Sequence, residues 1–299
     1  MRKVYVTMVL WFTLIACEDV INVQVPSTEP RLIVNGLLRV DESQEFIPVE
    51  IKVTETGDFF EETQVTQLES ASIIYGQPIP EAPEILENMA TSSLVEIPPG
   101  SGIYIPDPTL NTDQRIRTSS LLPNTVFILV MEHKGKEYAA RTPYSKTIPI
   151  DNLSQGDETI FDEDDTEIKI TITDIQDIKN HYVFDFGFGE FFAFDDQFID
   201  GQQFEFSYFY EKDLVPGDEI EVSILGADQK FYNYIDLLVE QTQTDGGAFA
   251  PPVTTVRGNL LDVTGLENTL LFENINRPED FPLGFFAVVE EFKHVLVIE

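Results

Sequence analysis

Apolar and polar residues alternate along several short segments in the first half of the chain. Ile47, Val49, Ile51 and Val53 fall on one face of an extended segment, because side chains two positions apart in a strand point the same way. This period of two predicts a half-buried strand.

A tight hairpin is predicted farther along. Two β-type runs, residues 125–132 and 136–141, flank Lys134-Gly135, and Gly tolerates the positive φ that a tight turn requires. Another apolar run, residues 71–75, is expected to end at Gly76 before a Pro-rich loop. Short strands without a long helical pattern predict an Ig-like or prealbumin-like β-sandwich over residues 31–147.

The second half, residues 148–299, begins with an acidic stretch and then returns to alternation. Every second residue from Tyr182 to Phe188 is aromatic, which predicts a strand with one aromatic face. One helix is predicted over residues 228–242, with Asp228 as its N-cap and apolar residues at helical spacing. We therefore expect a mostly β protein in which the N-terminal sandwich is followed by a second β-rich domain with one covering helix.

Residues 1–16 have the features of a bacterial lipoprotein signal peptide. A basic start precedes an apolar run from Val4 to Ile15, which is shorter than the roughly 20 residues of a transmembrane helix. The run ends in Leu14-Ile15-Ala16-Cys17, and Cys17 is the only cysteine, so the segment resembles a lipobox; an ordinary secretory signal is the alternative. We expect lipidation at Cys17 and a tether over residues 17–30, since two or more acyl chains anchor a protein stably.

Two acidic residues, Glu18 and Asp19, directly follow the cysteine. Acidic residues at this place are similar to the export signal of Bacteroidota surface lipoproteins. That resemblance implies an outer-membrane location with the protein facing the cell exterior.

Composition argues against one class of partner. The chain has 53 acidic and 18 basic residues, a net charge of −35, whereas nucleic-acid binding requires clustered Lys and Arg that neutralise phosphates. We therefore expect no nucleic-acid partner. With 42% apolar residues, the chain is able to bury a core.

The sequence contains no catalytic signature. The three histidines, His133, His181 and His294, lie far apart and form no zinc-binding pair. There is no Gly-x-Ser-x-Gly nucleophile motif. We expect a protein that is not an enzyme, and a surface hydrolase with paired carboxylates remains the alternative, because many acids produce chance pairs.

Two acidic groups are candidate calcium ligands. Asp162, Asp164 and Asp165 lie in a dense acidic run between the two expected domains, and calcium prefers six to eight oxygen ligands. Such a run is also typical of a solvated linker. A second candidate is Asp195-Asp196 with Asp200. We expect no other cofactor.

Aromatic residues supply the candidate binding surface. Phe191, Phe192 and Phe194 interrupt strict alternation, so some of these rings are candidates for an exposed patch that contacts a ligand or partner. The alternative is a sheet whose two faces are both covered, one by the core and one by the helix.

Six short motifs occur in a fixed order along the chain. They are Cys17-Glu18-Asp19-Val20-Ile21, Leu32-Ile33-Val34-Asn35-Gly36, Gly102-Ile103-Tyr104, Gly135-Lys136-Glu137-Tyr138, Pro251-Pro252 followed by Gly258-Asn259, and Pro282-Leu283-Gly284-Phe285-Phe286. Together they resemble DUF4249, a family of Bacteroidota outer-membrane lipoproteins. The resemblance implies an accessory subunit of a TonB-dependent outer-membrane barrel that imports nutrients, with a role in envelope or barrel assembly as the alternative. It carries over no catalytic residue.

Overall fold

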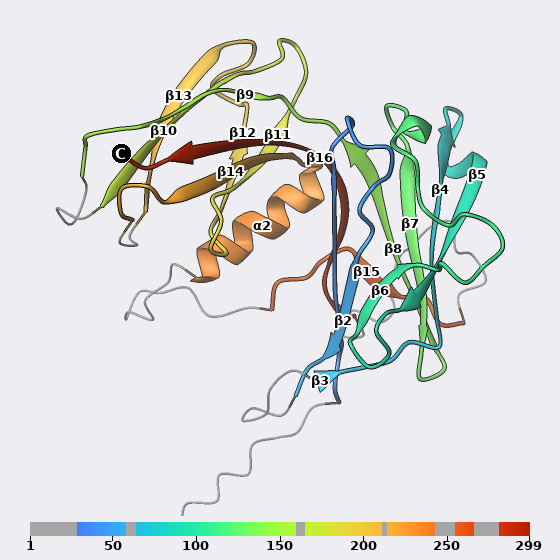
Figure 1. Ribbon diagram of the computed structural model, residues 1–299. Coiled ribbons are helices and arrows are strands. Elements are labelled where there is room, and N and C mark those ends of the chain that lie inside the picture. Colours follow the sequence, from blue (N-terminus) through green and yellow to red (C-terminus); the bar gives the residue numbers. More distant parts are fainter. Residues whose placement is uncertain (1–28, 58–63, 160–164, 211–213, 243–254, 266–280) are drawn as a thin grey trace, which may run out of the picture.

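The computed structural model describes residues 29–57, 64–159, 165–210, 214–242, 255–265 and 281–299 (Figure 1). These residues form one large sheet, a second three-stranded sheet and the helix α2. The predicted mostly β fold with one covering helix is therefore confirmed. Cys17, Glu18, Asp19, Asp162 and Asp164 lie outside the described residues.

The N-terminal lobe is a β-sandwich built on strands β1 to β8. Their bounds are β1 Leu32–Val40, β2 Ile51–Glu55, β3 Gln64–Val65, β4 Ser70–Ile79, β5 Ala82–Glu96, β6 Ile103–Pro106, β7 Val126–His133 and β8 Lys136–Ser145. A short 3-10 turn, Thr118–Ser120, and β15, Leu260–Asp262, complete the lobe. Hydrogen bonding follows the order β1-β2-β6-β5-β4-β7-β8-β15.

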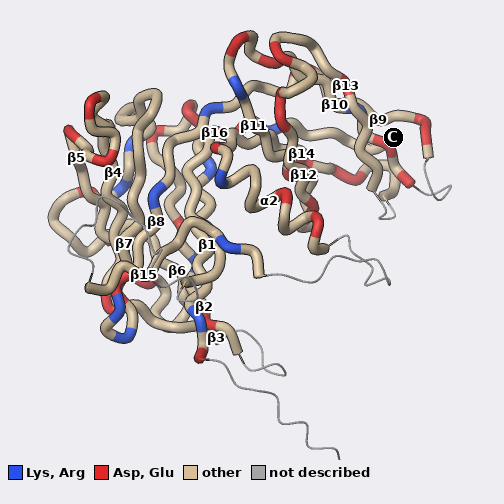
Figure 2. Tube along the Cα trace, turned by 180° about the vertical axis from the view of Figure 1, so that it is seen from behind, with Lys and Arg blue, Asp and Glu red and all other residues tan. Residues whose placement is uncertain are grey.

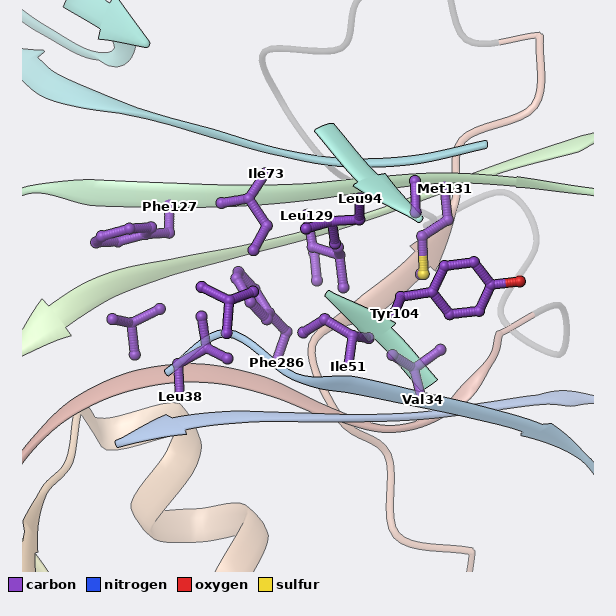
Figure 3. Close-up of a cluster of buried hydrophobic side chains, with 14 of the residues drawn as sticks. Val34, Leu38, Ile51, Ile73, Leu94, Tyr104, Phe127, Leu129, Met131 and Phe286 are labelled. Carbon is purple, nitrogen blue, oxygen red and sulfur yellow. The ribbon is translucent and has the colours of Figure 1, made fainter. Parts of the chain in front are cut away.

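The core of this lobe is filled from the inward positions of its strands (Figure 3). Phe127, Leu129 and Ile73 have no exposed surface. Ile47 and Val49 are also buried, together with Ile51 and Val53, although β2 begins only at Ile51. The predicted common face is therefore confirmed over a strand shorter than the alternation suggested.

The predicted hairpin between β7 and β8 is confirmed. Lys134 and Gly135 have φ values of 51° and 70°, and the strands pair from His133↔Lys136 to Val126↔Pro143. Two consecutive positive φ angles are what a type I′ turn requires.

The prediction that the run at residues 71–75 ends at Gly76 is wrong. β4 continues to Ile79 and returns as β5, and the paired strands shift register between Tyr75 and Gln77 and between Pro78 and Ile79. These irregularities allow proline, which lacks a backbone N–H, to lie within the hairpin.

The C-terminal lobe packs two sheets and a helix in layers. Its elements are β9 Ile150–Gln155, β10 Thr166–Thr173, β11 His181–Asp185, β12 Phe191–Asp195, β13 Gln203–Tyr210, β14 Glu219–Gly226, α2 Gln229–Thr242 and β16 Leu283–Val297. The sheet β13-β10-β9 covers one face of β12-β11-β14-β16, and α2 covers the other (Figure 1). Ile168, Ile170 and Ile172 are fully buried between the sheets.

The helix begins as the sequence predicts. The Asp228 side chain accepts a hydrogen bond from the Phe231 N–H at 2.8 Å, which satisfies a backbone donor that the first turn leaves free. Phe231 and Ile235 are the buried residues of α2 and pack on β11, β12 and β16. One predicted aromatic position differs: Phe188 has a φ of 54° and is 58% exposed in the turn after β11.

The last strand belongs to both lobes. β16 pairs with β1 from Ile33↔Leu283 to Val40↔Glu290, and then with β14 from Leu225↔Glu291 to Glu219↔Val297. It also meets β8 at Val288↔Tyr144, so the strands of the N-terminal sandwich close on themselves. Leu260, Phe286 and Val288 lie beyond the predicted boundary between residues 147 and 148, yet they complete the first core. The sequence does not indicate this, because partners so distant along the chain leave no local pattern.

Candidate functional site

A layer of aromatic rings fills the space between β11, β12 and β13. Phe186 stacks on Tyr208 at 3.6 Å between ring centroids and 5° between planes. Phe194 stacks on Phe204 at 5.4 Å. Other close pairs include Phe184–Phe206 at 5.1 Å, Phe192–Phe206 at 5.8 Å, Phe194–Phe206 at 6.2 Å and Tyr208–Tyr210 at 5.0 Å. Each such pair adds roughly 0.5–1.5 kcal/mol beyond the area it buries.

The three phenylalanines predicted as one binding patch are divided by strand alternation. Phe191 packs with Ala193 against the helix-side core, whereas Phe194 packs against the core between the sheets. Phe192, on the same side as Phe194, is 38% exposed. Most of this surface therefore fits the alternative given above, a sheet with both faces covered. Of the three predicted rings, Phe192 is the most exposed.

The aromatic layer is open on one side because two sheets end there together. β12 is the last strand of the large sheet and β13 the last strand of the small one. Within the described part of the chain, no further strand pairs with β12 beyond β11, or with β13 beyond β10. We call this surface the aromatic edge: Phe192, Phe194, Phe204, Phe206 and Tyr208, with the outer backbone edges of β12 and β13.

Phe204, Phe206 and Tyr208 are not part of the predicted patch, although they occupy alternate positions of β13. Both β12 and β13 carry aromatic residues at every second position, on the inward face. That shared period was the available signal, but the stacking of two end strands is a tertiary feature that one sequence does not reveal.

Polar groups around the aromatic edge are held by hydrogen bonds and are acidic. The Tyr208 hydroxyl donates to Glu190, and the Tyr210 hydroxyl donates to the Phe186 carbonyl at 2.7 Å. Burial raises the pKa of Tyr210 above its ordinary value. Neither β12 nor β13 contains Lys or Arg, and Figure 2 shows acidic positions spread over both lobes. The site therefore offers apolar rings beside negative charge.

The second predicted calcium group lines an open pocket of about 650 Å³. Asp195, Asp196 and Asp200 are brought together there with Asp177. Carboxylate oxygens of this group already accept hydrogen bonds from backbone N–H groups. Asp200, for example, accepts the Asp177 N–H at 2.8 Å. Among the residues that the structure describes, no group of three or more His, Cys, Asp or Glu side chains has the geometry to hold a metal ion. Asp165, the described member of the first predicted group, lies directly before β10.

Two carboxylate pairs where the lobes meet are each bridged by a cation. Arg39 donates to both Asp185 and Glu291. A hydrolase of the kind considered above would use one carboxylic acid with a raised pKa. Asp185 and Glu291 instead share the Arg39 guanidinium as ion-pair partners.

Lys146 bridges the second pair, Glu42 and Glu290. Its hydrogen bond lowers the pKa of Glu42 below the ordinary value, opposite to the shift of a general acid. Glu290 also accepts the Thr147 N–H at 2.9 Å. Both bridged pairs therefore connect the lobes and have features of structural ion pairs.

Asn259 and Gly284, from the two late motifs, hold β16 in place, whereas Pro251 and Pro252 lie outside the described residues. The Asn259 side chain donates to the Phe286 carbonyl at 2.7 Å and accepts the Phe286 N–H at 2.9 Å. Gly284 has a φ of 90°, and a Cβ there would lie 1.9 Å from the Val34 carbonyl oxygen. The motif residues therefore have a role in seating the shared strand.

This architecture defines a two-lobed β-sandwich protein with an aromatic strand edge. The chain belongs to the DUF4249 family, a domain of unknown function, whose family model matches residues 18–268. No curated protein matches the chain. In the described part of the chain, no helix has the length and apolar character needed to cross a membrane.

Proposed function

We propose that the chain is a lipid-anchored, surface-exposed outer-membrane lipoprotein that acts as a non-enzymatic binding subunit, with a TonB-dependent receptor as its partner. The observation that supports this most is the aromatic edge. Two stacked sheets end side by side there, and partly buried rings lie between their outer strands, with Phe192 38% exposed.

The edge offers two complementary modes of contact. Backbone N–H and C=O groups on the outer side of β12 and β13 can extend a sheet by accepting a strand from a partner. Aromatic side chains supply anchors of the type that dominates binding energy at protein interfaces. Because β12 and β13 lack Lys and Arg, we expect basic residues on the partner segment.

The anchor part of the proposal is supported by the sequence motif. Cys17 follows an apolar run and a small residue, and residues 17–30 separate it from β1. Replacing Cys17 with Ser should abolish incorporation of radiolabelled palmitate and move the protein from the membrane to the soluble fraction. Unchanged incorporation would contradict lipidation at Cys17.

The binding part is tested by affinity purification of the tagged, full-length protein from detergent-solubilised outer membranes, with mass spectrometry of what co-purifies. We expect a TonB-dependent receptor in near-stoichiometric amount. Phe192→Asp should reduce its recovery at least tenfold, because a charge replaces an edge ring. Phe198→Asp is the matched control, since this 83% exposed side chain lies in the loop beyond β12.

Each other outcome points to a different role. Equal recovery by Phe192→Asp and wild type would exclude the aromatic edge as the contact. Barrel-assembly components in place of a receptor would support the envelope-assembly alternative. Recovery of no partner, with hydrolysis of a glycan or peptide panel, would favour the hydrolase alternative.

A further inference from the structure

A second cavity lies on the opposite lobe, on the outer face of the N-terminal sandwich. It has a volume of about 430 Å³, within the range typical of small-molecule sites. Ile74, Ile128, Val130 and Ala139 from three neighbouring strands line its apolar part. Ile74, Ile128 and Val130 are only partly buried, and Ala139 is buried but lies outside the main core cluster of the lobe.

One arm of β5 contributes two further apolar side chains. Leu86 and Met89 line the cavity, and Met89 is 64% exposed. The Arg141 guanidinium, on β8, donates to the Pro83 carbonyl. This bond ties the β5 arm to the sheet and so maintains the hollow between them.

Charge around the cavity has one sign. Its lining includes Glu84, Glu132 and Glu137 and contains no Lys, Arg or His. Glu132 and Glu137 lie directly opposite each other on β7 and β8, an arrangement of like charges that destabilises a sheet. Burial lowers the pKa of Arg141, and the nearby negative charge of Glu84 offsets part of that lowering.

The lysines of the adjacent hairpin bind other carboxylates. Lys134 pairs with Glu55 at 2.7 Å, and Lys136 lies 3.8 Å from Asp262. Neither Glu132 nor Glu137 forms an ion pair with any described residue. A bound cation would therefore relieve the repulsion between these two side chains.

We infer that this cavity binds a small organic cation: an ammonium group with an aliphatic or arylalkyl body. The ammonium would lie between Glu132 and Glu137, and the body would cover Val130, Ile128 and Ala139. Charge complementarity selects a cation over an anion, and the apolar lining selects an amphiphile over a hydrated metal ion. The inference rests on a different face from the aromatic edge and is independent of the proposed function.

Isothermal titration calorimetry of the full mature protein at low ionic strength and pH 7 tests it with three probes of equal length. Octylammonium should bind at least tenfold more tightly than octanol, and octanoate should not bind. Comparable binding of all three would overturn the assignment of a cation site. Absence of octylammonium binding would overturn the site altogether.

Two variants locate the effect. Glu132→Gln with Glu137→Gln keeps the shape, and it should weaken octylammonium at least tenfold and remove its advantage over octanol. Ala139→Phe places a large ring in the cavity lining and should abolish binding of both octylammonium and octanol. Glu50→Gln, an exposed carboxylate before β2, should leave the affinity unchanged, and retained far-ultraviolet circular dichroism establishes that each variant is folded. Wild-type affinity in the double variant would refute the proposal.

Discussion

Asn259 allows a quantitative test of how the shared strand is held. Its side-chain amide forms a two-way pair with the backbone of Phe286, whose side chain has no exposed surface. The same amide lies 3.4 Å from the Arg141 carbonyl of β8. Asn259 thus bridges β16 and β8 just before those strands meet at Val288↔Tyr144.

Replacing Asn259 with Ala removes both hydrogen bonds and leaves a backbone donor and acceptor without these partners. Each half-buried group left unpaired costs about 1–3 kcal/mol, so we expect the free energy of unfolding to fall by about 2–4 kcal/mol. Asn259→Asp should cost at least as much. Its carboxylate still accepts the Phe286 N–H but cannot donate, and it places negative charge against two carbonyl oxygens.

Urea unfolding followed by far-ultraviolet circular dichroism measures the change. A lower midpoint with an unchanged slope indicates lost stability rather than a different unfolded state. Asn152→Ala is the matched control, because Asn152 is exposed on β9, and we expect a change within about 0.5 kcal/mol. If Asn259→Ala is as stable as that control, or Asn259→Asp as stable as wild type, the proposed closure of the sheet by this amide is refuted.

Three further predictions concern charges and backbone geometry. Arg39→Met leaves two mostly buried carboxylates without their shared cation and should lower the free energy of unfolding by about 2–3 kcal/mol, measured by urea unfolding. Hydrogen bonding from Arg115 lowers the pKa of Asp113 to about 2; the stability it confers is present above the ordinary pKa of 3.8 and is lost as pH falls through about 2. In Arg115→Ala, a carboxyl NMR titration should return that pKa toward 3.8, and an unmoved midpoint would contradict this cause. Gly284→Ala should cost about 3 kcal/mol, because a positive φ and a backbone clash coincide there; a thermal midpoint equal to wild type would show that β16 shifts freely.

Local chemistry accounts for the parts of the fold that the sequence predicts correctly. The turn at Lys134-Gly135 and the Asp228 cap each depend on residues within four positions of one another. The buried face of Ile47, Val49, Ile51 and Val53 likewise follows from a period of two. In each case a short segment contains the whole physical reason for its conformation.

The errors arise where distant segments decide the outcome. β4 continues past Gly76 because β5 pairs with it through two irregularities, although the prolines there favour a loop. Phe188 continues the aromatic alternation, but the chain turns at residues 187–189 with positive φ angles.

The candidate site shows the same division. Phe191, Phe192 and Phe194 are adjacent in sequence, yet a strand presents them to two separate cores. The aromatic edge depends on which strands are last in their sheets, and pairing order is set by partners far along the chain. Glu132 and Glu137 are an exception, since a two-residue turn at Lys134-Gly135 by itself places them opposite one another.

The shared strand also sets an order in time. β1 is among the first segments to be synthesised, but its parallel partner begins at Leu283. The first lobe therefore cannot complete its sheet until nearly the whole chain exists. Domains commonly fold from the N-terminus during synthesis, whereas contacts between distant segments slow folding. We accordingly expect folding to be late and concerted, with the N-terminal sandwich and the C-terminal lobe closing together.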